Sequence, residues 1–330
     1  MSVTAEIPVI DISSLSKGDE KAASQVGVQI RKACMEHGFF YVVGHGVPIG
    51  LQTQLMDLSQ QFFSLPEQEK MKISMTLGGR AWRGYFPVGD ELTSGKPDQK
   101  EGIYFGTELP ENHPKVVSKT PLHGGNQFPK EPDLLGKVVL DYMTEVTCVG
   151  HSVMKGIAIS LGLPPDHFES GITKDPFILF RIFHYPATLR GQDERWGVGE
   201  HTDYGLITIL KQDEVGGLQI RSNGHWMDAP PVPNSFICNI GDMLDRMTNG
   251  LYLSTPHRVR NSSGRNRLSF PLFFDPNFDA VVNHIPCTEN ARSEASDRWD
   301  DADVYSFDGT YGDYLINKVS KVFPQLSNKL

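Results

Sequence analysis

The stretch Gly199-Glu200-His201-Thr202-Asp203-Tyr204-Gly205 places an imidazole and a carboxylate two residues apart, and a second histidine, His257, follows downstream. Residues i and i+2 of an extended segment point to the same face, so His201 and Asp203 can reach one ion together. Two histidines and one carboxylate that leave coordination positions open are typical of non-haem iron sites, although zinc enzymes use similar ligands. A lone His-x-Asp also occurs by chance, with the histidine in a structural role. The surrounding sequence must decide between these alternatives.

A second pair of polar residues, Arg267 and Ser269, has the same spacing on a segment that is rich in apolar residues and is predicted to be a strand. Arginine presents a planar fork that can bind a carboxylate through two parallel hydrogen bonds, and serine adds a hydroxyl donor. The pair is therefore a candidate carboxylate site. The alternative is an exposed strand with alternating polar residues.

Composition limits the class of protein. The chain has 330 residues and a formal net charge of -9, from 31 basic and 40 acidic residues, and it has no basic run. These features argue against a nucleic-acid-binding protein, which needs clustered Lys and Arg. The four cysteines form no Cys-x-x-Cys pair, so a zinc ribbon or a disulfide framework is not expected. The N-terminus has no signal peptide and no apolar run is long enough to span a membrane, so we expect a cytoplasmic protein.

The two halves of the chain differ in pattern. In residues 1–130 the sequence pattern predicts a strand at Ile7–Asp11, a helix that ends at Gly38, and then another strand and another helix. An irregular region follows from about residue 78. Residues 131–330 predict a long helix, a β-rich core and a C-terminal helix. Together the halves are expected to form one compact unit. The predicted core strands are Phe177–Tyr185, Leu206–Leu210, Gly217–Arg221, Ser235–Ile240, His257–Arg260, Arg267–Phe274 and Ala280–Ile285. A series of short strands separated by turns favours a β-sandwich or β-barrel, and a double-sheet jelly roll is the natural candidate.

Several motifs occur in a fixed order. They are Ile7-Pro8-Val9-Ile10-Asp11, Gly38-Phe39-Phe40-Tyr41-Val42-Val43, Gly199–Gly205, Gly216-Gly217-Leu218-Gln219, Asn239-Ile240-Gly241-Asp242, Ser254–Val259 and Arg267–Phe274. With these motifs the chain resembles the iron(II)/2-oxoglutarate-dependent dioxygenases of the isopenicillin N synthase-like superfamily, from about residue 7 to about residue 320. The resemblance implies a mixed α+β fold, a distorted double-stranded β-helix, or jelly roll, buttressed by helices from the N-terminal half.

The resemblance also implies a set of ligands. His201, Asp203 and His257 would bind Fe(II), and Arg267, Ser269 and Tyr185 would bind the co-substrate 2-oxoglutarate. Many plant members carry Asn at the position of Phe183, so that additional contact is not expected here. The implied reaction uses O2, with ascorbate as a supporting reductant. It couples oxidative decarboxylation of 2-oxoglutarate to hydroxylation, or a related oxidation, of a small organic molecule.

The candidate substrate contacts rest on weaker likenesses. Asp90–Asp98 resembles a segment of bacterial ethylene-forming enzymes, in which the matching Glu and Thr help to bind arginine, while residues 184–187 and 199–221 resemble fungal thymine dioxygenases. The candidates are Glu91, Thr93, Arg181, Tyr204, Tyr85 and Phe274. The alternative for Glu91 is a solvated loop carboxylate, and Phe39, Phe40, Phe273 and Phe274 also fit a role in the core.

Two other functions stay open at this point. A same-fold oxidase that does not use 2-oxoglutarate, of the isopenicillin N synthase or aminocyclopropanecarboxylate oxidase type, also keeps an Arg-x-Ser pair. A non-catalytic β-roll binding protein would have no need for three metal ligands. A zinc hydrolase lacks an obvious general-base motif and leaves Arg267 and Ser269 unexplained.

Overall fold

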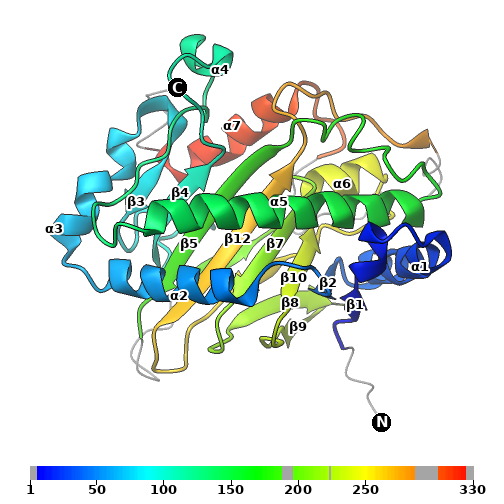
Figure 1. Cartoon of the computed structure of the whole chain (residues 1–330), viewed down its shortest axis with the longest axis horizontal. Coiled ribbons are helices and arrows are strands. Elements are labelled where there is room, and N and C mark those ends of the chain that lie inside the picture. Colours follow the sequence, from blue (N-terminus) through cyan, green and yellow to red (C-terminus); the bar gives the residue numbers. More distant parts are fainter. Residues whose placement is uncertain (1–5, 188–195, 223, 287–303, 325–330) are drawn as a thin grey trace.

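A computed structural model describes residues 6–187, 196–222, 224–286 and 304–324. It contains one large and one small β-sheet, with helices packed across one face of the large sheet (Figure 1). The mixed α+β fold predicted from the sequence is therefore confirmed. Among the described residues, no helix combines the length and the apolar character that a membrane span requires.

The large sheet has the strand order β1-β2-β10-β7-β12-β5-β4-β3. Only β1 and β2 run parallel, and the other neighbours are antiparallel. Strands from both sides of residue 130 thus share one sheet. Their bounds are Val9–Asp11 (β1), Phe39–Val43 (β2), Gly84–Phe86 (β3), Glu101–Gly106 (β4), Phe177–Tyr185 (β5), Ile207–Gln212 (β7), Phe236–Ile240 (β10) and Arg267–Asp275 (β12).

The small sheet has the order β6-β11-β8-β9. Its strands are Val198–His201 (β6), Leu218–Ser222 (β8), His225–Asp228 (β9) and His257–Val259 (β11). Side chains from β6, β8 and β11 line the same cavity as side chains from β5, β7, β10 and β12. The two sheets therefore enclose a cavity between them, as expected for a jelly roll.

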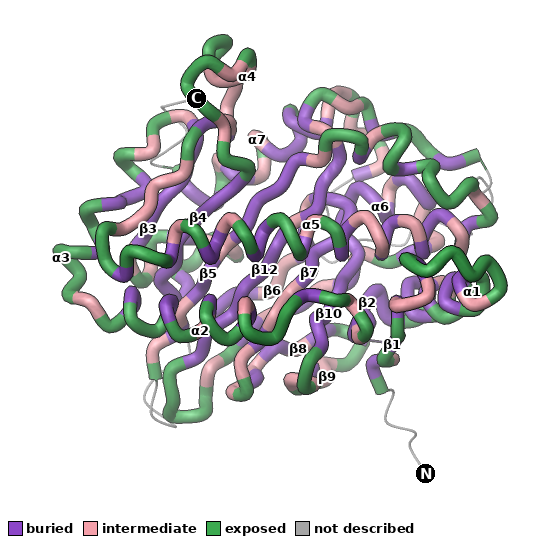
Figure 2. The backbone as a smooth tube through the Cα atoms, in the orientation of Figure 1, coloured by how far each residue is buried: buried purple, intermediate pink, exposed green. Residues whose placement is uncertain are grey.

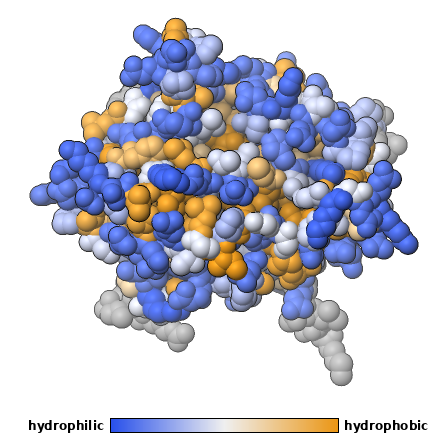
Figure 3. All heavy atoms as spheres, viewed as in Figure 1, coloured by the Kyte–Doolittle hydropathy of each residue, from blue (hydrophilic) through white to orange (hydrophobic). Residues whose placement is uncertain are grey.

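Helices α1 (Glu20–Glu36), α2 (Ile49–Phe63) and α5 (Leu135–Ser160) lie on the face of the large sheet that is turned away from this cavity (Figure 1). The strands behind them are mostly buried, whereas the helices are exposed on their outer side (Figure 2). Hydrophilic side chains cover much of that outer surface, with hydrophobic ones between α2 and α5 (Figure 3). The remaining helices are α3 (Glu67–Lys70), α4 (Pro114–Val117), α6 (Asp242–Met247) and α7 (Tyr311–Val322), with 3-10 turns at Ser13–Ser16, Met71–Ile73, Met75–Leu77 and Gly79–Ala81.

Helix α1 ends where the sequence predicts. Gly38 has a φ of +65°, and its N–H donates to the carbonyl of Ala33 at 3.0 Å. A Cβ atom at this position would lie 2.1 Å from the carbonyl oxygen of Leu253. Only glycine fits this left-handed turn without displacing a neighbouring backbone, and the turn leads directly into β2.

Two expectations about secondary structure need correction. The region after residue 78 is not uniformly irregular, because β3 and β4 join the large sheet. All residues of both strands are buried, so their sequences lack the polar alternation of a half-exposed strand. Ala280–Ile285 is not a strand: Val281, which is 53% exposed, forms only an isolated bridge with Thr310. The short elements β6, β9 and α6 were not predicted.

Candidate metal centre and substrate pocket

The sheet topology brings His201, Asp203 and His257 together. His201 ends β6 and His257 begins β11, and the two are directly paired across the antiparallel strands. The Oδ1 atom of Asp203 lies 3.7 Å from Nε2 of each histidine, and the three candidate ligand atoms all lie within 4.8 Å of one another. Asp203 follows the end of β6, so it reaches the group from a loop and not from a continuous strand. Two imidazole nitrogens and one carboxylate oxygen suit a divalent metal such as Fe(II).

Backbone carbonyls orient the two histidines. Nδ1 of His201 lies 2.8 Å from the carbonyl of Gly199, and Nδ1 of His257 lies 3.2 Å from the carbonyl of Thr255. A carbonyl can only accept, so each Nδ1 carries a proton, and Nε2 is the ring nitrogen of each histidine that faces Asp203. Burial, together with the neighbouring His257, lowers the pKa of His201 to about 3. The His201 imidazole is therefore neutral, the form that binds metals.

Two side chains that sequence reasoning did not select hold Asp203. The Oγ1 hydroxyl of Thr208 and the Nδ2 amide of Asn239 donate to Asp203 Oδ2, at 2.5 and 2.7 Å. Burial alone would raise the pKa of the Asp203 carboxyl, but His257, His201 and these hydrogen bonds lower it overall. Oδ1 is left to face the two histidines. The Asn239-Ile240-Gly241-Asp242 motif was the available signal for this role.

Arg267 and Ser269 form the second part of the site. Arg267 pairs with Tyr185 across β12 and β5 and is completely buried. Its Nε donates to the Gly216 carbonyl at 2.5 Å and its Nη2 donates to Gln212 at 3.1 Å, but Nη1 has no hydrogen-bond partner among the described residues. The Ser269 and Tyr185 hydroxyls lie 3.5 Å apart beside it. An unpartnered guanidinium nitrogen next to two hydroxyls fits a carboxylate ligand.

One cavity joins these two groups. It has a volume of about 980 Å³ including its open mouth, and the three candidate metal ligands, Arg267, Ser269 and Tyr185 all line it. Apolar side chains of α7 and of the residue that follows it also line the cavity. They are Leu315, Val319, Val322 and Phe323. The cavity therefore combines polar groups from the sheets with apolar groups from the C-terminal helix.

Glu91 lies in the wall of this cavity and is only 2% exposed, so it is not a solvated loop carboxylate. Lys100 Nζ lies 2.8 Å from its Oε2, Arg181 Nη1 lies 3.5 Å from its Oε1, and the Tyr104 hydroxyl donates to it. Burial alone would raise the pKa of Glu91, but Lys100 and Arg181 lower it overall. The carboxylate is therefore held in its ionised form.

Arg181 has an unusual environment in the same wall. Its guanidinium carbon lies 4.1 Å from the centre of the Tyr104 ring and 4.6 Å from that of the Phe273 ring. Its Nε is buried and has no hydrogen-bond partner. Stacking fixes the plane of the guanidinium while leaving donors at its edge. Arg181 and Glu91 thus give this part of the cavity one group of each charge.

Four of the six predicted substrate contacts line the cavity: Glu91, Thr93, Arg181 and Tyr204. Tyr85 does not, because its hydroxyl donates to Glu101 at 2.5 Å in a separate buried cluster. Phe274 is also absent from the cavity wall, since its ring packs against Gly150 and His151 of α5. Neighbouring residues on a strand point to opposite faces, so Phe273 faces the cavity instead. Phe39, expected in the core, also lines the cavity and contacts His257.

Two family models match the chain. Residues 7–131 match the model for the non-haem dioxygenase in morphine synthesis N-terminal region, and residues 177–276 match the 2OG-Fe(II) oxygenase superfamily. The chain is 50% identical to a probable iron/ascorbate oxidoreductase of Dictyostelium discoideum, over 98% of this chain and 97% of that protein. It is 39% identical to a homoarginine-6-hydroxylase of Glycine max, over 98% of each. The crystal structure of a full-length Neurospora crassa protein in complex with alpha-KG and thymine has a TM-score of 0.77 and 27% identity, over 97% of each chain.

Proposed function

Because this chain belongs to the 2OG-Fe(II) oxygenase superfamily and is an oxidoreductase that uses Fe(II) and 2-oxoglutarate, we propose that His201, Asp203 and His257 hold the iron. The convergence of two imidazole nitrogens and one carboxylate oxygen supports this assignment. When bound, the iron supplies the oxygen chemistry that couples decarboxylation of 2-oxoglutarate to hydroxylation, or a related oxidation, of a small organic molecule.

Arg267, Ser269 and Tyr185 bind the carboxylate of 2-oxoglutarate that lies away from the metal. The observation that carries this proposal is the buried, unpartnered Nη1 of Arg267, which lines the same cavity as the three iron ligands. A buried donor without an acceptor costs free energy, and a ligand carboxylate would remove that cost. The hydrogen bonds from Arg267 to Gly216 and Gln212 keep the fork in place before the co-substrate arrives.

The oxidised substrate occupies the part of the cavity that is bounded by Glu91, Thr93, Arg181 and Tyr204. Glu91 and Arg181 offer one negative and one positive group, which suits a substrate that carries both charges. An amino acid with a basic side chain has this chemistry, and the soybean relative is named for homoarginine. We therefore place basic amino acids first among the candidate substrates, ahead of a nucleobase such as the thymine bound to the Neurospora protein.

The test is a coupled assay in which succinate formation and O2 uptake are measured with Fe(II), ascorbate and a panel of homoarginine, arginine, lysine and thymine. We expect equal amounts of succinate and oxidised product with a basic amino acid. His201→Ala abolishes turnover, whereas His225→Ala, which changes an exposed histidine on β9, leaves it intact. Substrate oxidation with O2 uptake but no succinate would contradict the proposal and indicate an oxidase that does not use 2-oxoglutarate.

A further inference from the structure

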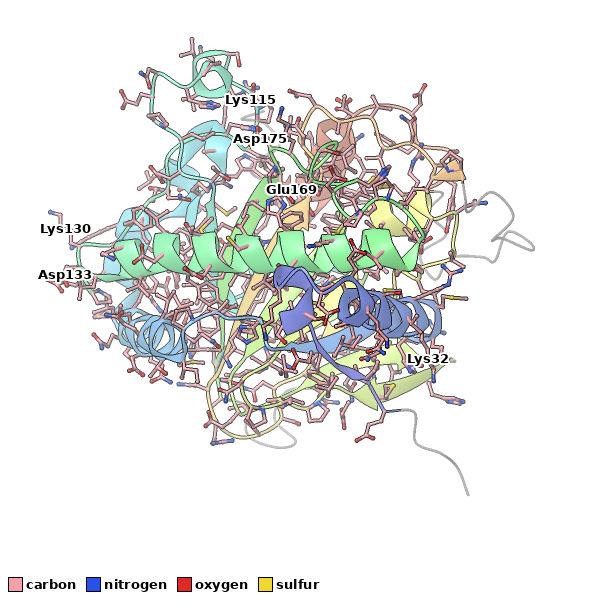
Figure 4. All side chains as sticks on the ribbon, turned by 45° about the vertical axis from the view of Figure 1, so that its right-hand side comes forward. Lys32, Lys115, Lys130, Asp133, Glu169 and Asp175 are labelled. Atoms are coloured by element: carbon pink, nitrogen blue, oxygen red, sulfur yellow. The ribbon has the colours of Figure 1, made fainter. Side chains whose placement is uncertain are left out.

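A second cleft lies outside the metal pocket, where α4 and its flanking loops approach the beginning of β5. Its volume is about 460 Å³ including its mouth, and it shares no lining residue with the metal pocket. Lys115 and Asp175, two of its lining residues, lie close together above the long helix α5 in Figure 4. The lining residues are Arg83, Thr107, Leu109, His113, Lys115, Leu122, His123, Asp175, Pro176, Phe177, Asn277 and Phe278.

Arg83 is the notable group in this cleft. It is 2% exposed, and its Nη2 donates to the Leu122 carbonyl at 2.9 Å, but its Nε has no hydrogen-bond partner in the part of the chain that the structure describes. Within the described ranges, no carboxylate lies within ion-pair distance of its guanidinium. Burial lowers the pKa of Arg83 to about 10, which still leaves it protonated at neutral pH. Glu108 is the charged neighbour that partly offsets this effect and raises the pKa of Arg83, but it lies beyond ion-pair distance. A buried guanidinium has five donors and gains from an anion that bonds to it directly.

Neighbouring side chains add further donors. Nδ1 of His113 accepts a hydrogen bond from the backbone N–H of Lys115, so its proton is on Nε2, which can donate. The Lys115 side chain is 23% exposed and lies at the opening of the cleft. Its ammonium group has three donors, and the structure shows one acceptor for it, Asp279 at 2.6 Å. The cleft therefore combines a buried fork with donors nearer the surface.

The nearby carboxylates already have partners. Asp279 pairs with Lys115, Asp175 accepts from the side chain of Asn277, and Glu108 accepts from Asn126. None of them satisfies the Nε of Arg83. An oxygen acceptor from outside the described residues, such as that of a bound anion, would complete its hydrogen bonds.

We propose that this cleft binds a small oxyanion, a carboxylate or a phosphate group, through the guanidinium of Arg83, with His113 and Lys115 as further contacts. Both groups present the planar or tetrahedral oxygens that an arginine fork binds through paired hydrogen bonds. The reaction of the metal pocket does not use this cleft, so the ligand is separate from the iron-bound co-substrate.

The experiment is isothermal titration of sodium phosphate, and separately of sodium succinate, into the full chain saturated with Fe(II) and 2-oxoglutarate without oxygen. Saturation keeps both probes out of the metal pocket, and sodium chloride at equal ionic strength gives the baseline. We expect one saturable site. Arg83→Lys, which keeps the charge but removes the fork, weakens binding by at least about tenfold. Arg265→Lys, at an exposed arginine paired with Glu214, leaves it unchanged.

Lys115→Gln is the second variant, because this partly exposed side chain can be changed without disturbing the core, and it weakens binding several-fold. If circular dichroism shows that Arg83→Lys does not fold, the affinity of Lys115→Gln for the anion is the deciding measurement. Binding of phosphate alone, of succinate alone or of both supports the site and identifies the anion. Absence of saturable binding above the chloride baseline, or unchanged affinity in the folded Arg83→Lys or in Lys115→Gln, overturns the proposal.

Discussion

The two hydrogen bonds to Asp203 give the sharpest prediction about the metal centre. Thr208 and Asn239 are direct partners on the neighbouring strands β7 and β10, and both donate to Oδ2 of Asp203. They leave only Oδ1 facing His201 and His257. Thr208→Val removes one donor while keeping the shape of the side chain. We expect this change to weaken metal binding, because the carboxylate loses part of its fixed orientation.

The size of the effect follows from the type of bond. A hydrogen bond to a charged acceptor contributes roughly 1.5–3 kcal/mol, and each 1.4 kcal/mol is about a factor of ten in an equilibrium constant. The Kd for the metal should therefore rise by about 10- to 100-fold, which is the usual effect of removing a partner of a metal ligand. Asn239→Leu combined with Thr208→Val should exceed the sum of the single changes, since only the double variant leaves Oδ2 buried without a donor.

The assay is a titration with Co(II), followed by its visible absorption, so that metal binding is measured independently of turnover. Thr147→Val is the matched control, because the Thr147 hydroxyl donates to the Met143 carbonyl within α5, away from the site. Thermal unfolding of each metal-free variant checks that the fold is retained. A Co(II) affinity of Thr208→Val equal to that of Thr147→Val would refute the argument that these bonds position Asp203.

Four further predictions concern the rest of the cavity. Arg267→Lys keeps the charge but loses the fork, so the KM for 2-oxoglutarate in the succinate assay should rise by about 10- to 100-fold; an unchanged KM would remove Arg267 from the co-substrate site. Glu91→Gln leaves Lys100 without one of its buried partners, so the free energy of unfolding measured in urea should fall by about 3 kcal/mol. Wild-type stability of this variant would show that the pairing of Glu91 with Lys100 does not stabilise the fold. Phe274→Ala should lower the free energy of unfolding by about 3–5 kcal/mol, because it removes the contact with α5. Phe273→Ala should mainly raise the KM for the oxidised substrate, because Phe273 lines the cavity. A large loss of stability in Phe273→Ala and a raised KM in Phe274→Ala would contradict the strand faces described above. Removing the metal with a chelator should stop succinate formation and added Fe(II) should restore it, and turnover that persists after chelation would exclude an iron enzyme.

The sequence carried much of the architecture because the relevant signals are local. The periodic apolar residues of α5, the glycine that ends α1 and the long runs of aromatic and aliphatic residues in β5 and β12 all indicated their elements directly. Strands β3 and β4 gave no such signal, because their apolar stretches, Tyr85-Phe86 and Ile103-Tyr104-Phe105, are short and lie next to glycines. Ala280–Ile285 had the composition of a strand but found no partner strand, and pairing is a property of the whole sheet.

The residues of the candidate site also fall into two groups, those predicted from the sequence and those recognised only in the structure. From the sequence, residue type and i, i+2 spacing selected His201 with Asp203 and Arg267 with Ser269. The ordered motifs of the family that the chain resembles added His257 and implied the full set of ligands. Only the tertiary structure decided that these groups share one cavity, that Glu91 is a buried and paired carboxylate, and that Phe273 faces the cavity while Phe274 packs on α5. It also showed that Thr208 and Asn239 hold Asp203. The physical reason is that burial, pairing and strand face depend on long-range packing and sheet register, which short sequence patterns do not encode.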